Sequence, residues 1–243
     1  MAGKAVIHKS ASKAKRANSI SFDLARLSVR DVNQRLHDAR GGRFEIANPS
    51  GAHALACGID APLEVIIDGH AGYYCAGMNK AASVTINGSA STGVAENMMS
   101  GRVHVKGDAG QSAGATGVGG LLIIDGNASA RLGISLRGLD IVVKGSIGHM
   151  AAFMAQAGSI VVLGDAGDAL GDSLYEARLF VRGKVGSLGT DCVRKEMRDN
   201  HRAKLRRLLD AAGIGREVDV SDFIRYGSAR RLYNFHIDNL GSY

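Results

Sequence analysis

The sequence contains no tryptophan, two prolines and only three cysteines in 243 residues. Cys57, Cys75 and Cys192 form no CxxC pair, and three cysteines cannot make an even-numbered disulfide framework, so we expect buried free thiols. No stretch has the length and apolarity of a transmembrane helix or of a signal-peptide core. These features argue against a disulfide-rich secreted domain and a membrane protein, and we expect a cytoplasmic protein.

Acidic residues are fewer than basic ones, with 23 Asp and Glu against 30 Lys and Arg, so the formal net charge is +7 at pH 7. The excess of Lys and Arg lies before residue 44 and after residue 190, outside the glycine-rich centre. Basic proteins often bind nucleic acid, but no recognition motif accompanies these charges, so we expect no nucleic-acid partner. Residues 1–20, rich in Lys and Ser, are expected to be a disordered basic extension.

Glycine is abundant, with 33 residues, and one glycine recurs every nineteen positions. A β-branched residue or leucine stands four positions before each of these glycines, and valine or isoleucine stands two before. Alternating apolar residues followed by glycine indicate a short, half-buried strand and a corner. The repeat glycines are Gly69, Gly88, Gly107, Gly126, Gly145, Gly164 and Gly183.

Repeats of this length that carry a strand each are typical of a solenoid, because one unit alone cannot bury its apolar face. The fold class predicted is therefore an all-β solenoid, a parallel β-helix of seven to eight coils over residues 44–190. The number of strands in each coil stays open. Short helical caps are expected at both ends.

The flanking segments are expected to form these caps, because the open end of a solenoid exposes unpaired strand edges. Residues 21–43 are read as a strand followed by a helix that begins after Ser28 and ends near Gly41. Residues 191–243 are read as a helical and docking tail, with one helix over 192–212 and a second starting at Asp222.

The chain offers little sign of chemistry of its own. Gly110, Ser112 and Gly114 match the G-x-S-x-G string of hydrolases, but these glycines belong to the repeat and no strand-to-helix turn is expected there. The histidines do not stand at metal-ligand spacing. We therefore predict no catalytic, cofactor-binding or metal-binding residue on this chain.

The coil corners carry aromatic residues and methionines at similar places in successive repeats. Two interpretations are open: these side chains pack inside wide corners, or they form a partner-binding face, because such a patch is costly to leave exposed to water. The basic and aromatic C-terminal residues are a second place where a partner could dock. The candidate interface residues are Tyr73, Tyr74, Met78, Asn79, Glu96, Asn97, Met98, His149, Met150, Phe153, Tyr175, Tyr226, Arg230, Tyr233 and Phe235.

The repeated Gly-x-x-Gly corners, as in Gly107–Gly110 and Gly164–Gly167, resemble the GXGXG β-helical domain that ends the large subunit of glutamate synthase. The related β-helical subunit of formylmethanofuran dehydrogenase shares them. Residues 72–80, 93–101, 145–156 and 225–230 are similar to the stand-alone, GlxC-type form of this domain, the middle subunit of N-methylglutamate synthase. This similarity extends from about residue 22 to the end of the chain.

The resemblance implies a non-catalytic β-helical subunit in a glutamate-synthase-like heteromeric complex. One partner would be a glutaminase-like amidotransferase subunit. The other would be an FMN-binding, glutamate-synthase-like subunit that also carries an iron–sulfur cluster, and together they would make N-methyl-L-glutamate from methylamine and L-glutamate. The alternatives are the β-helical subunit of a formylmethanofuran dehydrogenase-like formyltransferase/hydrolase complex and, with less support, a free-standing β-helix that acts on polysaccharide.

Overall fold

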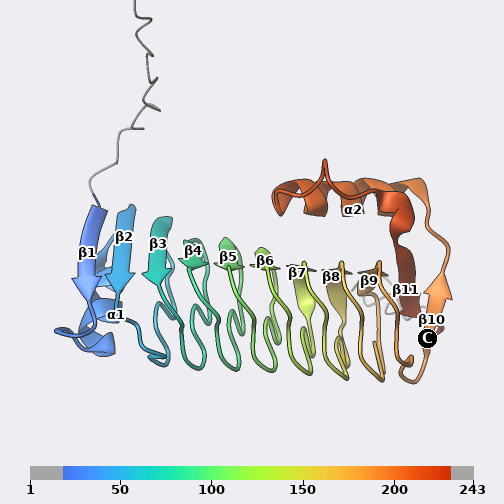
Figure 1. The fold of residues 1–243 in the computed structure, drawn as a ribbon, viewed down its shortest axis with the longest axis horizontal. Helices are drawn as coiled ribbons and strands as arrows, with labels where there is room; N and C mark the ends of the chain where they lie inside the picture. The colour runs from blue at the N-terminus through green and yellow to red at the C-terminus, as the bar shows by residue number, and fades with distance from the viewer. Residues whose placement is uncertain (1–18, 231–243) are drawn as a thin grey trace, which may run out of the picture.

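Successive coils each contribute one short strand to a single sheet, and the strands stack along the axis of a rod (Figure 1). This computed structural model describes residues 19–230. Nine strands run parallel in sequence order, and the last two join the end of the sheet antiparallel. The strands are β1 (Ser19–Asp23), β2 (Gly42–Ala47), β3 (Leu63–Asp68), β4 (Ser83–Ile86), β5 (Arg102–Val105), β6 (Leu121–Ile124), β7 (Arg137–Val143), β8 (Ala157–Val162), β9 (Arg178–Val181), β10 (Cys192–Lys195) and β11 (Ile224–Ser228).

The predicted parallel β-helix is confirmed, with about seven turns. Between β3 and β9 the register follows the nineteen-residue repeat: Val65 pairs with Val84, and Val84 with Val103. The two apolar positions before each repeat glycine point inward and are buried. Burying an aliphatic side chain stabilises the fold by about 1.5–3 kcal/mol, so the repeated pair accounts for much of the core.

The strand count per coil, left open by the sequence, is one. A second ladder is a single residue wide and joins the residues two positions after the repeat glycines, such as Ala90 and Ala109. The repeat glycines themselves lie where neighbouring coils touch. A Cβ at Gly126 would fall 2.9 Å from the carbonyl carbon of Gly107 and 2.3 Å from Oδ1 of Asp108, so only glycine allows this approach.

A ladder of polar side chains runs along the residues that immediately follow the repeat glycines. Each side chain accepts a hydrogen bond from the backbone N–H of the residue nineteen positions later, at 2.7–3.1 Å. This satisfies corner N–H groups that no strand partner reaches. The accepting side chains are those of His70, Ser89, Asp108, Asn127, Ser146 and Asp165.

The N-terminal cap contains α1 (Val29–Asp38), and its predicted N-cap is confirmed, since Ser28 Oγ accepts from the backbone N–H of Asp31 at 3.1 Å. Val32 and Leu36 of this helix are buried in the core. The helix ends at Asp38, earlier than the expected Gly41, because Ala39 is already extended. The first coil is irregular as well: Ile46 pairs with Ile67, two residues off the nineteen-residue register.

The C-terminal cap differs from the prediction in two places. The expected helix over 192–212 is wrong in its first part, because residues 192–195 form β10 and the helix α2 (Asp199–Ala211) begins later. The expected helix from Asp222 is also wrong: a 3₁₀ turn, η1 (Val220–Asp222), precedes strand β11. β11 pairs with both β9 and β10, and this pairing satisfies the backbone groups of the open sheet edge.

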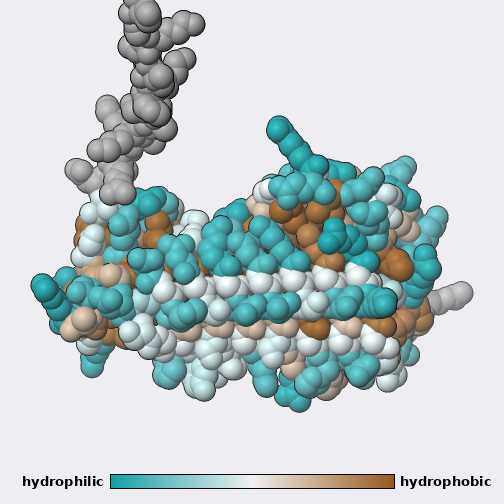
Figure 2. Space-filling model, viewed as in Figure 1, coloured by the Kyte–Doolittle hydropathy of each residue, from teal (hydrophilic) through white to brown (hydrophobic). Residues whose placement is uncertain are grey.

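Helix α2 lies along the outer face of the later strands (Figure 1). Leu205, Leu208 and Leu209 pack on Ile123 and Phe180, and hydrophobic side chains gather beneath the helix (Figure 2). Two polar contacts, one from the middle of the helix and one at its C-terminal end, reinforce this docking. Lys204 Nζ binds Asp140 Oδ2 at 2.5 Å, and Arg102 Nη1 donates to the carbonyl of Ala211 at 2.9 Å, at the C-terminal end of the helix.

Candidate partner-binding surface

Six equivalent turns connect the one-residue ladder to the next strand, and we call them the arcs: residues 73–80, 92–99, 111–118, 130–137, 149–156 and 168–175. In every arc the second, fourth and sixth residues have positive φ angles. This shared pattern gives the six arcs one conformation despite their varied sequences. Each arc has an inward and an outward set of positions, and the inward set includes the adjacent third and fourth residues.

The fourth position of every arc is alanine or glycine and is buried. Where glycine stands there, a neighbouring side chain fills the space: a Cβ at Gly114 would fall 2.8 Å from Cδ1 of Ile141. The seventh position is likewise buried in every arc. The residues at this seventh position are Asn79, Met98, Gly117, Leu136, Ala155 and Leu174.

The sixth and eighth positions face outward, and several of them carry large apolar side chains. Met78 and Met99 are each about half exposed, at 51% and 50%. Val118 and Met154 are exposed too, and so are Tyr73 and Tyr74 at the start of the first arc. We call Tyr73, Tyr74, Met78, Met99, Val118 and Met154 the arc surface. Rows of similar side chains run along the rod because equivalent positions of successive coils stack (Figure 2).

The structure separates the candidate interface residues into three groups. Tyr73, Tyr74, Met78, His149 and Arg230 are exposed. A second group is half-buried and reaches the surface in part. Its members are Glu96, Asn97, Met150, Phe153 and Tyr175.

Three candidates were wrong as surface residues, because they are buried within this chain. Asn79 is at the inward seventh position, where its side chain donates to the carbonyl oxygens of Ala82 and Ser100 and accepts from the N–H of Ala82. Met98 occupies the same position one coil later. Tyr226 lies in β11 with its ring in the main core. Tyr233 and Phe235 lie outside the described residues.

The candidate interface residues did not include Met99, Val118 and Met154, which are exposed. A signal was present, because apolar side chains stand at the sixth or eighth position of several arcs. Using this signal required knowing which positions of the arc face inward and which face outward. The corners therefore hold residues of both kinds: Met98 packs inside and Met99, its neighbour, faces water. That a partner covers the exposed ones stays a prediction.

Polar contacts fix the arcs in place around this surface. The ring of Tyr73 stacks on His53, with centroids 4.5 Å apart, and the backbone N–H of Tyr73 donates to Nδ1 of His53. Thr116 Oγ1 donates to Oδ1 of Asn97 in the preceding arc at 2.6 Å. Burial raises the pKa of Glu96. The arc surface is thus held by a rigid scaffold.

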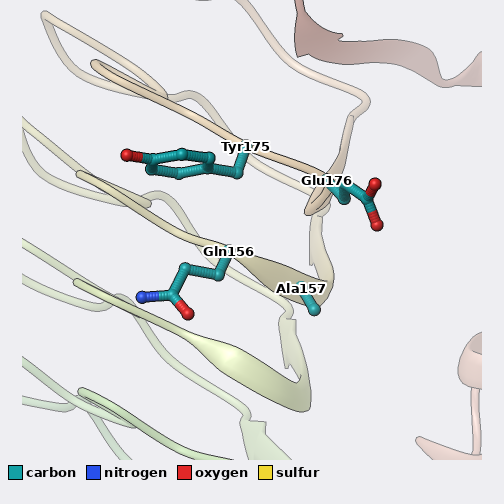
Figure 3. A pocket seen from close by; sticks show the side chains of 4 residues that line it. All are labelled: Gln156, Ala157, Tyr175 and Glu176. Atoms are coloured by element: carbon teal, nitrogen blue, oxygen red, sulfur yellow. The ribbon is translucent and has the colours of Figure 1, made fainter. Parts of the chain in front are cut away.

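A cleft of about 420 Å³ lies at the end of the last two arcs. Gln156 and Tyr175, both at the eighth arc position, extend in the same direction on consecutive coils, while Ala157 and Glu176 point the other way (Figure 3). A cleft lined by a tyrosine and an amide can accept a side chain from a partner. It extends the arc surface toward the C-terminal cap.

The ionisable groups of the solenoid wall are engaged in structural contacts. Asp125 binds Nε2 of His104 at 2.9 Å and Nζ of Lys144 at 2.7 Å. These partners outweigh burial and lower the pKa of Asp125, whereas burial lowers the pKa of His104. Within residues 19–230, no three His, Cys, Asp or Glu side chains are grouped so that they could hold a metal ion.

The environments of the three cysteines and of Ser112, the serine of the G-x-S-x-G string, are those of structural residues. Cys75 is buried, and burial raises the pKa of the Cys192 thiol to about 11. Cys57 Sγ donates to the carbonyl of Tyr74 at 2.6 Å. Ser112 is the second residue of an arc, with φ 58°, and is not part of a strand-to-helix turn. Among the described helices none is long and apolar enough to span a bilayer.

No family model matches the chain. The chain is 60% identical over 226 residues to Protein GlxC of Rhizobium meliloti (strain 1021), an alignment that covers 91% of this chain and 99% of that protein. The chain belongs to the GlxC family. Because the alignment spans nearly the whole of the GlxC protein, the similarity is not restricted to a part of the relative.

Proposed function

We propose that this GlxC-family chain is the β-helical, non-catalytic subunit of an N-methylglutamate synthase. In this role it holds a glutaminase-like subunit and an FMN- and iron–sulfur-containing, glutamate-synthase-like subunit in a fixed relation. The complex converts methylamine and L-glutamate to N-methyl-L-glutamate and ammonia. The resemblance of the repeat corners and of the arc sequences to this enzyme's middle subunit supports this choice of reaction.

The arc surface is the observation that carries the scaffold role. Tyr74, Met78 and Met154 are exposed and also have positive φ angles of 58°, 55° and 53°. An L-residue in the left-handed region costs about 1–2 kcal/mol relative to glycine, and asparagine tolerates it better. Asn97, one coil after Met78, shows that a polar residue fits the same position.

Two disadvantages therefore coincide at Met78 and Met154: a strained backbone and an apolar side chain in water. The strain recurs in every arc, so the feature that distinguishes Met78 and Met154 is the exposed apolar side chain. Methionine and aromatic side chains are enriched at protein interfaces. A row of such residues on a rigid rod suits a surface that is covered when a partner subunit binds.

Co-purification of the tagged full-length chain from its native host tests the proposal. Two partner proteins, flavin absorbance in the eluate and methylamine-dependent formation of N-methylglutamate are expected. Amidohydrolase-like and formyltransferase-like partners without flavin would instead support the formylmethanofuran dehydrogenase-like alternative. A chain that purifies alone would refute both assignments.

Met78→Asn tests whether the arc surface makes the contact. Asparagine relieves the backbone strain, so the melting temperature of the isolated chain should be equal or higher, while recovery of at least one partner should fall about tenfold. Val193→Asn is the matched control, because Val193 is an exposed apolar residue in β10, away from the arcs. Equal partner recovery with both variants would rule out Met78 as a contact residue.

A further inference from the structure

Cationic side chains gather on the outer face of the last three strands of the sheet. Arg178 is the first residue of β9, Arg225 lies in β11, and Lys195 ends β10. Lys195 and Arg225 are directly opposite each other in the antiparallel pair of β10 and β11. Like charges at such a position destabilise a sheet, so their presence needs a reason.

The N-terminal end of α2 adjoins these strands and adds further positive potential. Arg198 is the N-cap residue, and His201 lies in the first turn, where its Nδ1 accepts from the backbone N–H of Arg198 at 3.2 Å. The N-terminus of a helix carries a partial positive charge. An arginine at this position is therefore electrostatically unfavourable unless an anion is near.

The strands and the helix enclose a cleft of about 540 Å³. This volume lies within the range of small-molecule sites. The cationic and imidazole side chains that line the cleft are Arg178, Lys195, Arg198, His201, Arg225 and Arg230.

The carboxylates near the cleft neutralise only part of this positive charge. Glu196 binds Arg198 at 3.0 Å, and Arg230 forms an ion pair with Asp191 outside the cleft lining. Glu176 is the other acid in the lining. In the described part of the chain, no carboxylate forms a salt bridge with Arg178, Lys195 or Arg225.

The pKa shifts of two groups in the cleft agree with an excess of positive charge. Burial and the neighbouring Arg178 and Arg198 lower the pKa of Arg225. Burial and the same group of arginines lower the pKa of His201. Both shifts mean that adding positive charge here is costly and that a bound anion would be stabilised.

We propose that the cleft between β9, β11, β10 and the start of α2 binds a small molecule carrying at least two negative oxyanion charges, as a phosphate group or as two carboxylates. Arginine guanidinium groups bind both kinds of oxyanion through paired hydrogen bonds. The backbone N–H groups of a helix N-terminus add further donors. This site is independent of the arc surface and of the proposed complex.

Thermal denaturation and calorimetric titration of the full-length chain test the proposal. The probes are sodium phosphate, sodium pyrophosphate and sodium succinate, each compared with sodium chloride at equal ionic strength. A saturable rise in melting temperature with at least one probe, absent with chloride, is expected. A response only to the phosphates indicates a phosphoryl ligand, and a response only to succinate indicates a dicarboxylate. Equal effects of all salts, or no effect, would overturn the proposal.

The double variant Arg178→Gln/Lys195→Gln locates the site. It should weaken anion binding at least tenfold and should not lower the melting temperature of the ligand-free chain, because it relieves repulsion. The control is Arg202→Gln/Arg207→Gln, which removes the same charge from exposed positions of α2 outside the cleft lining. If the first variant binds as tightly as the control, the cleft is not the binding site.

Discussion

Replacing Gly126 by valine should disrupt the middle of the solenoid. Gly126 follows β6 and lies in the stack of repeat glycines, where its N–H donates to the carbonyl of Gly107 and its carbonyl accepts from Gly145, both at 3.0 Å. A Cβ at this position falls 2.3 Å from Asp108 Oδ1 and 2.9 Å from backbone atoms of Gly107. Real Cβ contacts are longer, so the two coils must separate.

The cost has two parts. Asp108 must rotate away and lose the hydrogen bond that it accepts from the N–H of Asn127 at 2.7 Å. A bond to a charged acceptor is worth about 1.5–3 kcal/mol. Forcing extra volume into a packed region costs about 1–3 kcal/mol more. Together the two terms predict a loss of about 2.5–6 kcal/mol, which corresponds to a fall in melting temperature of roughly 5–24 °C for a chain of this size.

Thermal and urea denaturation monitored by circular dichroism measure this loss. Gly41→Val is the matched control, because Gly41 follows α1, has no atom within 4 Å of a built Cβ and is not among the glycines with positive φ. The control should change stability by no more than about 0.5 kcal/mol. Gly126→Ala already carries the clashing Cβ and provides a measurable variant if the valine variant does not fold.

The reasoning would be refuted if Gly126→Val and Gly41→Val melted at the same temperature. It would also be refuted if Gly126→Ala were as stable as the unmodified chain. Either result would mean that adjacent coils leave room for a side chain at the repeat glycine. The nineteen-residue spacing would then be maintained by the strands alone.

Three further predictions concern polar groups of the solenoid. Asn127→Ala removes the acceptor for the backbone N–H of Ser146 at 2.9 Å and should cost about 0.5–1.5 kcal/mol in urea denaturation; no loss would show that water replaces the side chain fully. Asn79→Ala leaves the buried N–H of Ala82 without its partner and should cost about 1–3 kcal/mol, measured in the same way, and a loss under 1 kcal/mol would contradict that role. Burial holds the folded-state pKa of His104 below the unfolded value of about 6.5. Its contribution to stability is therefore present above about pH 6.5 and is lost as the pH falls from that value through the folded pKa. His104→Gln should therefore show a smaller loss of melting temperature between pH 7.5 and 5.5, and an unchanged loss would mean that another group dominates.

The nineteen-residue glycine repeat by itself determined the solenoid and its parallel sheet. Equivalent residues of an exact repeat must stack, so Val65, Val84 and Val103 form one buried column in any parallel arrangement. The serine cap of α1 was also readable, because it depends only on neighbouring residues. Local and periodic signals sufficed for these features.

The direction of each arc side chain depended on the tertiary structure. Met78 faces water and Asn79 faces the core, although they are adjacent and hydropathy alone suggests the reverse. The left-handed residues at the second, fourth and sixth positions set the path of the arc, and non-glycine residues adopt this conformation only because the neighbouring coils hold the arc. The sequence identified the corner residues as interface candidates, but it could not separate the exposed ones from the buried ones.

The C-terminal cap also depended on long-range pairing. β11 inserts between β9 and β10, although β10 precedes it in the chain by a helix and a turn. This pairing places Arg225 beside Lys195 and near Arg178, residues that are far apart in sequence. No local sequence pattern predicts that proximity, because it arises when β11, which is distant in sequence, pairs with the free edge of the solenoid at β9.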